Sequence, residues 1–137
     1  MKIELDKFKE VNIRDIWKHE AYDFSNWLAQ EENINELGEI LGLSLVDVNT
    51  EVSAGSFKSD IVCTDEITGK KIIIENQLEK SDHDHLGKII TYASGLDASV
   101  IVWIVAEARE EHASAVEWLN NHTDKDISIF LIEIHVY

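Results

Sequence analysis

Two acidic residues, Asp60 and Glu75, are placed where they could act together on a metal ion and a phosphate group. Asp60 lies in FKSDIVCT, and Glu75 follows the apolar residues 72–74 in KIIIENQ. If residues 66–69 form a four-residue turn, the two segments pair antiparallel with Asp60 opposite Glu75, and their Cβ atoms lie about 5 Å apart. Carboxylates this close repel unless hydrogen bonds or a cation compensate them. Hard divalent ions such as Mg²⁺ bind one or two carboxylates together with water and phosphate oxygens, so the pair predicts half of a magnesium site.

The elements that must position this pair follow from hydrophobic periodicity. Apolar residues recur at helical spacing in ENINELGEILGL, and Gly42 is a typical residue after a helix C-terminus, so a helix is expected there. Alternating and apolar segments predict strands over residues 44–53, 57–64 and 71–77. The links between these strands are short, which favours an antiparallel meander.

The second half of the chain alternates helices with strands. A helix is expected from an N-cap at Ser81, with Asp84 as its capping-box partner, to about residue 94. The apolar run ASVIVWIVA predicts a buried strand, and ISIFLIEIHVY predicts a last strand after a helix that carries Val116. Helical crossovers add parallel strands, so the expected fold is α/β, with a mixed β-sheet flanked by helices.

Length and composition limit the class of protein. The chain has 137 residues, of which 45% are hydrophobic and 28% charged, which suits one domain, with residues 1–30 as an N-terminal helical extension. It has one cysteine, no apolar leader, and no apolar run long enough to cross a bilayer, so a cytoplasmic protein away from the membrane is expected. The net charge of −15 disfavours non-specific binding of polyanions.

SDIVCT and KIIIENQ, in the expected order of helix, three strands, helix and strand, resemble the PD-(D/E)XK nuclease superfamily. The longer string IIIENQLEKSDHDHLGKIITYA, with WLNNH at 118–122, is similar to the N-terminal domain of prokaryotic proteins that carry a DUF4268 domain. The resemblance implies a restriction-endonuclease-like αβββαβ core, here with an extra helix and strand. It also allows for a C-terminal domain beyond this chain.

The resemblance further implies a metal site. Asp60 and Glu75 would bind Mg²⁺ or Mn²⁺, and a glutamate on the first core helix would be a third ligand. Glu36 is preferred to Glu39 for this role, because Glu36 lies nearer the edge of the helix face that Ile34 and its apolar neighbours bury.

The superfamily's catalytic lysine is replaced here by Gln77. An amide can orient the attacking water but supplies no charge to stabilise the phosphate. Lys88, or else Lys58, is expected to supply the cation. The implied function is metal-dependent hydrolysis of phosphodiester bonds in DNA.

A competing hypothesis is a catalytically inactive nuclease-fold domain that serves in dimerisation or protein interaction. Gln77 and the acidic composition favour this alternative. His83 and His85 have i, i+2 spacing, which does not let two helical side chains bind one ion, so helix capping is the simpler interpretation. The side chain of His85 could still point towards the predicted metal site, and Tyr92 lies two turns further along the same helix face.

Overall fold

The computed structural model describes residues 9–18 and 20–137. The strands in this part of the chain are β1 (Leu45–Ala54), β2 (Phe57–Asp65), β3 (Lys71–Asn76), β4 (Val100–Val105) and β5 (Ser128–Glu133). The helices are α1 (Ile13–Ile16), the π-helix η1 (Glu20–Phe24), α2 (Ser25–Leu28), α3 (Glu31–Leu41), α4 (His83–Leu96) and α5 (Glu110–His122). Residues 1–8 of the expected N-terminal extension lie outside the described ranges.

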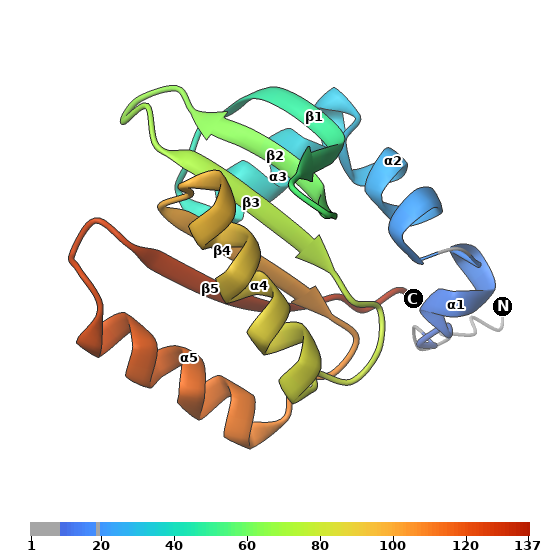
Figure 1. Cartoon of the computed structure of the whole chain (residues 1–137). Coiled ribbons are helices and arrows are strands. Elements are labelled where there is room, and N and C mark those ends of the chain that lie inside the picture. Colours follow the sequence, from blue (N-terminus) through green and yellow to red (C-terminus); the bar gives the residue numbers. More distant parts are fainter. Residues whose placement is uncertain (1–8, 19) are drawn as a thin grey trace, which may run out of the picture.

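The five strands form one mixed sheet in the order β1-β2-β3-β4-β5 (Figure 1). The first three strands pair antiparallel, and β3, β4 and β5 pair parallel. The expected meander and the two helical crossovers are therefore confirmed. The register of β2 and β3 runs from Thr64 opposite Lys71 to Ile61 opposite Ile74, as the turn at residues 66–69 predicts.

Helices cover both faces of the sheet, because the central strands are apolar on both sides. All six residues of β4 are buried. Ile34 and Leu37 of α3 pack on one face against Ile61 and Ile74. On the other face α4 and α5 pack against Ile73, Trp103 and their neighbours. Figure 1 shows α4 crossing one face of the sheet while α3 lies behind it.

The edge strand β1 is irregular. Its register against β2 shifts between Val46 and Asn49, which marks a β-bulge. Asp47 and Glu51 have φ angles of 52° and 49°, a left-handed conformation that is uncommon for residues other than glycine.

Two of the differences from the expected boundaries have a clear structural cause. The last strand ends at Glu133 rather than Tyr137, because Glu133 pairs with Val105, the last residue of β4. Beyond it, the described residues add only an isolated bridge between Val136 and Val11. The N-cap of α4 is Asp82, whose side chain accepts from the backbone N–H of His85, and not Ser81. Ser81 is fully buried and its hydroxyl is hydrogen-bonded to His112 Nδ1 at 2.6 Å, 31 residues away in sequence.

The N-terminal helices bury part of their apolar residues. Phe24 and Leu28 are buried, whereas Trp27 is 37% exposed. In residues 9–18 and 20–137, no helix combines the length and the apolar character that crossing a membrane requires.

Candidate functional site

The candidate site begins where β2 and β3 stop pairing through their backbones. The last paired residues are Ile61 and Ile74, and the next position places Asp60 opposite Glu75. Here the side-chain carboxylates, and not backbone carbonyls, accept the backbone hydrogen bonds. The N–H of Asn76 donates to Asp60 Oδ2 at 2.8 Å, and the N–H of Asp60 donates to Glu75 Oε1 at 3.4 Å. The hydroxyl of Ser59 also donates to Glu75 Oε1. The predicted pairing of the two acids is therefore confirmed.

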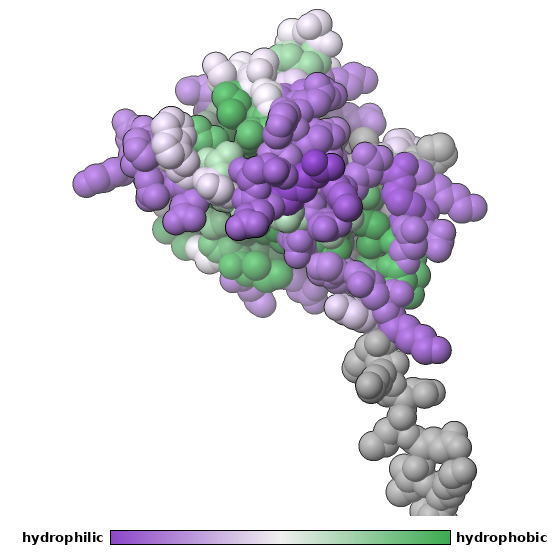
Figure 2. Space-filling model, turned by 90° about the horizontal axis from the view of Figure 1, so that it is seen from below, coloured by the Kyte–Doolittle hydropathy of each residue, from purple (hydrophilic) through white to green (hydrophobic). Residues whose placement is uncertain are grey.

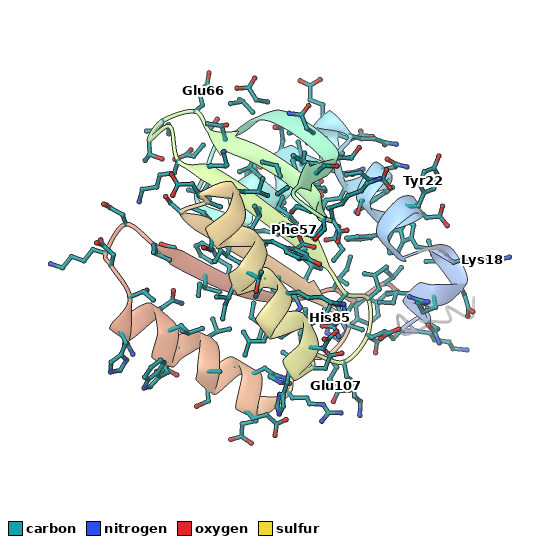
Figure 3. All side chains as sticks on the ribbon, viewed as in Figure 1. Lys18, Tyr22, Phe57, Glu66, His85 and Glu107 are labelled. Carbon is teal, nitrogen blue, oxygen red and sulfur yellow. The ribbon has the colours of Figure 1, made fainter. Side chains whose placement is uncertain are left out.

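The two acids line a cleft of about 190 Å³ between this end of the hairpin and α4. Its walls are formed by Lys58, Asp60, Glu75, Asn76, His85, Lys88, Ile89 and Tyr92. The four α4 residues follow helical spacing, so one face of the helix covers the acids. Tyr92 stacks on Phe57 with ring centroids 4.2 Å apart. Figure 3 shows Phe57 beside the middle of α4 and His85 nearer its N-terminal end.

The environment of the pair favours protonated carboxyl groups. Burial raises the pKa of Glu75, and repulsion from Asp60 adds to it, so that the pKa reaches about 8 despite the hydrogen bond from Ser59. Burial also raises the pKa of Asp60, against the opposing effect of the Asn76 N–H. The buried Glu75 and the partly buried Asp60 repel each other and form an oxygen-rich site that a proton or a cation would stabilise.

A pH dependence of stability follows for the metal-free protein. The ordinary pKa of Glu75 is 4.5 and rises to about 8 in the folded chain, so the folded chain binds this proton more tightly than the unfolded chain. The stabilising contribution is complete below pH 4.5 and is lost as the pH rises through 8. Between pH 5 and pH 8.5, the free energy of unfolding in urea should therefore fall by roughly 2 kcal/mol less in Glu75→Gln than in the wild type.

The exposed residue Glu36 supplies the matched control for that measurement. Glu36→Gln should leave the pH dependence of the free energy of unfolding as in the wild type. Equal slopes for wild type and Glu75→Gln would contradict the raised pKa.

The structure does not bring Glu36 to the cleft, and this corrects the expectation of a third acidic ligand. Glu36 is exposed on α3, whose buried residues pack on the sheet face opposite α4. Glu39, the alternative on the same helix, is also exposed and does not line the cleft. Helical periodicity identifies the buried side of α3, but it does not say which sheet face the helix covers.

Gln77 does not line the cleft either. Its side chain is fully buried, and its amide binds other groups of the protein. Gln77 Nε2 donates to the carbonyl of Lys80 at 2.9 Å and to Asp82 Oδ2 at 2.8 Å. Its Oε1 accepts from Trp103 Nε1 at 3.0 Å. The amide is thus not available to orient water beside Asp60 and Glu75.

Both candidate lysines reach the cleft. Lys88 lines it from α4, and its Nζ lies 3.0 Å from Asp84 Oδ2 in an exposed i, i+4 pair. The hydrogen bond to Asp84 raises the pKa of Lys88, so this side chain stays positively charged. Lys58 lines the cleft from β2, two residues before Asp60. Positive charge is therefore present at the rim of the cleft from two elements.

Asp82 contacts a residue that lines the cleft, and sequence reasoning missed this contact. Its Oδ1 accepts from Nδ1 of His85 at 2.8 Å as well as from the His85 backbone N–H at 2.7 Å. The i, i+3 spacing of an N-cap aspartate and a histidine could have suggested this contact. In the described residues, Asp82, Asp84 and His85 are a group whose potential metal-ligand atoms lie within 4.8 Å of one another.

A larger hollow of the described surface lies elsewhere. It is about 680 Å³ in volume, lies beside α5 and β5, and has Glu117 and Glu133 as its ionisable residues. Both of these acids are exposed, so the smaller cleft, with the buried Glu75 beside the partly buried Asp60, is the better candidate for chemistry.

Comparison of the sequence with family models and with curated proteins gives no match. Among solved structures, the chain is similar to a repair endonuclease from Pyrococcus abyssi, with 11% identity and a TM-score of 0.60 over 95% of this chain and 49% of that chain. It is also similar to EndoMS in the structure of an EndoMS-dsDNA2 complex, with 12% identity and a TM-score of 0.49 over 77% and 45% of the two chains. The chain thus spans about half the length of the repair endonuclease. The first match shows the fold: the five-stranded mixed sheet flanked by helices is a nuclease-like α/β fold.

Proposed function

We propose that this chain is a metal-dependent nuclease-like domain that hydrolyses phosphodiester bonds in DNA. The observation that carries the proposal is the convergence of Asp60 and Glu75 in one cleft, at the point where two central strands diverge. The fold shared with a repair endonuclease supports it.

The residues present fit a hard divalent cation. Asp60 and Glu75 offer carboxylate oxygens, the donors that Mg²⁺ and Mn²⁺ prefer, and their mutual repulsion is what a cation would relieve. When bound, the ion would polarise a phosphoryl oxygen and lower the pKa of a bound water. Lys58 and Lys88 would attract the phosphate to the rim of the cleft.

DNA is the proposed partner, and the lysines beside the cleft would bind its phosphates. The net charge of −15 opposes general binding of a polyanion, so affinity for DNA would depend on the few cations beside the cleft and would fall steeply with salt. The sequence resemblance to DUF4268-containing proteins supports a further proposal, that residues 1–137 are one nuclease-like domain of a longer protein.

A protein-interaction module is the second candidate. Ile90, which is 44% exposed, borders an apolar hollow of about 360 Å³ between α4 and α5. Figure 2 shows hydrophobic patches among the hydrophilic residues on the face seen from below. A hollow of this kind suits an apolar side chain from a second copy or another protein better than it suits DNA.

A nuclease assay tests the proposal. Supercoiled, linear and single-stranded DNA, with RNA for comparison, would be incubated with the protein in Mn²⁺, in Mg²⁺ and in EDTA. We expect cleavage that requires the ion and that Asp60→Ala lowers about 100-fold or more, since one of the two carboxylates would be lost. Glu36→Ala, a change of an exposed acid away from the cleft, should cleave like the wild type. Metal-independent cleavage, or equal cleavage by Asp60→Ala, would rule the proposed site out.

A further inference from the structure

A chain of hydrogen bonds leads from the buried core to the cleft. Trp103 Nε1 donates to Gln77 Oε1, Gln77 Nε2 donates to Asp82 Oδ2, and Asp82 Oδ1 accepts from His85 Nδ1, with lengths of 3.0, 2.8 and 2.8 Å. Trp103 and Gln77 are fully buried, so the far end of the chain is fixed by packing. The histidine at the near end lines the cleft beside Asp60 and Glu75.

These contacts fix the orientation of the His85 ring and the position of its proton. A carboxylate accepts hydrogen bonds but does not donate them, so Nδ1 of the neutral ring carries the hydrogen and Nε2 carries the lone pair. The backbone N–H of His85 donates to the same Asp82 oxygen at 2.7 Å, which locks the first turn of α4 to the ring. His85 also interacts electrostatically with Asp60, so the ring and that carboxyl group lie near each other.

We propose that His85 is the proton acceptor for the attacking water, and that Asp82 and Gln77 are positioning residues that hold its ring. This inference rests on the proposed nuclease function. Among the side chains that line the cleft, the two lysines are charged donors, and the two carboxyl groups are the proposed metal ligands. The imidazole is the remaining group, and its Nε2 lone pair can accept a proton.

The geometry favours a role through water over direct metal ligation. Asp82, Asp84 and His85 have potential ligand atoms within 4.8 Å of one another, whereas Asp60 and Glu75 do not belong to that group. Asp82 binds His85 and Gln77, and Asp84 is paired with Lys88, so this cluster is explained by contacts within the protein. His85 thus lines the same cleft as Asp60 and Glu75, but its ring and the two carboxyl groups do not form such a ligand group.

The step balances as an ordinary hydrolysis. Nε2 of His85 takes one proton from water, and the electron pair of that O–H bond forms the new O–P bond. The P–O bond to the leaving sugar oxygen breaks, its electron pair stays on that oxygen, and the oxygen takes a proton from solvent. The imidazolium then returns its proton to solvent. No oxidant, reductant or further reactant is needed.

His85→Ala tests this role in the intact chain with Mn²⁺ and DNA. We expect the cleavage rate to fall about 100-fold or more, as is usual when a general base is removed. The rise in melting temperature on adding Mn²⁺ should remain, and added imidazole should restore part of the rate. His83→Ala is the matched control, because His83 bonds to His112 and does not line the cleft; it should keep the wild-type rate.

Asp82→Asn tests the positioning residues through the ring itself. Nitrogen-15 NMR of His85 should show the hydrogen on Nδ1 in the wild type, and the hydrogen should move to Nε2 when an amide N–H faces Nδ1. A wild-type hydrogen on Nε2 would overturn the assignment of Asp82.

The outcomes separate this inference from the proposed function. An unchanged rate in His85→Ala would overturn the role of His85 and leave the nuclease standing. Loss of both the rate and the Mn²⁺ effect in His85→Ala, without rescue by imidazole, would make His85 a metal ligand and overturn the inference. A wild-type protein that cleaves none of the nucleic acids would overturn the nuclease function and the role of His85 together.

Discussion

Mn²⁺ at about one hundred times its dissociation constant should raise the melting temperature of the wild type by roughly 10 °C at pH 8, and Glu75→Gln should abolish the rise. A ligand at this excess stabilises the folded chain by about 2.7 kcal/mol, and each kcal/mol moves the melting temperature of a domain of this size by roughly 4 °C. The ion replaces the proton that the raised pKa of Glu75 otherwise retains. The rise should therefore be smaller at pH 5, where proton and cation compete.

The same variant gives a result of opposite sign without metal. The substitution removes the repulsion between Glu75 and Asp60. Metal-free Glu75→Gln should therefore have a higher melting temperature than the metal-free wild type at pH 8. Glu36→Gln, on the opposite face of the sheet, is the control and should keep the full Mn²⁺ effect. An equal rise in melting temperature for wild type and Glu75→Gln would show that the cation does not bind in this cleft.

Gln77→Leu should cost about 2–4 kcal/mol in the free energy of unfolding, although leucine has nearly the volume of glutamine. The substitution leaves the buried Trp103 N–H and the Lys80 carbonyl without their partner, and an unpaired buried polar group costs about 1–3 kcal/mol. Asp82 loses less, because its side chain is 45% exposed and water can replace the amide. Urea unfolding measures the change.

A double-mutant cycle isolates the Gln77–Trp103 hydrogen bond. Trp103→Phe removes the indole N–H, so Gln77→Leu should cost less in that background than in the wild type. Gln30→Leu is the matched control, since Gln30 is exposed, and surface substitutions change stability by about 0.5 kcal/mol or less. Additive costs for Gln77→Leu and Trp103→Phe would show that the hydrogen bond contributes nothing.

Much of the sheet could be predicted from the sequence, because its signals are local. Alternating and continuous apolar residues mark the strands, and the turn at residues 66–69 sets the register. Once the register is known, the pairing of Asp60 with Glu75 follows from geometry. The candidate acids are therefore the part of the site that pattern reasoning reaches.

The parts that were not predicted depend on contacts distant in sequence. Ser81 and Asp82 are both good helix caps by type, and what decides between them is His112, which binds the Ser81 hydroxyl. The partner of Gln77 on its other side is Trp103, 26 residues away. For the same reason Glu36 was placed in the site wrongly: the amphipathic pattern of α3 does not encode which sheet face it covers.

The irregular edge strand β1 should hinder self-association of the protein through its sheet. A sheet edge with a straight row of free backbone donors and acceptors can pair with the same edge of another molecule and seed aggregates. In β1 the bulge between Val46 and Asn49 interrupts that row, and the two left-handed residues of the strand, Asp47 and Glu51, are both acidic. Concentrated solutions of the protein should thus resist β-sheet extension through this edge, and a dimer, if one forms, should use another surface.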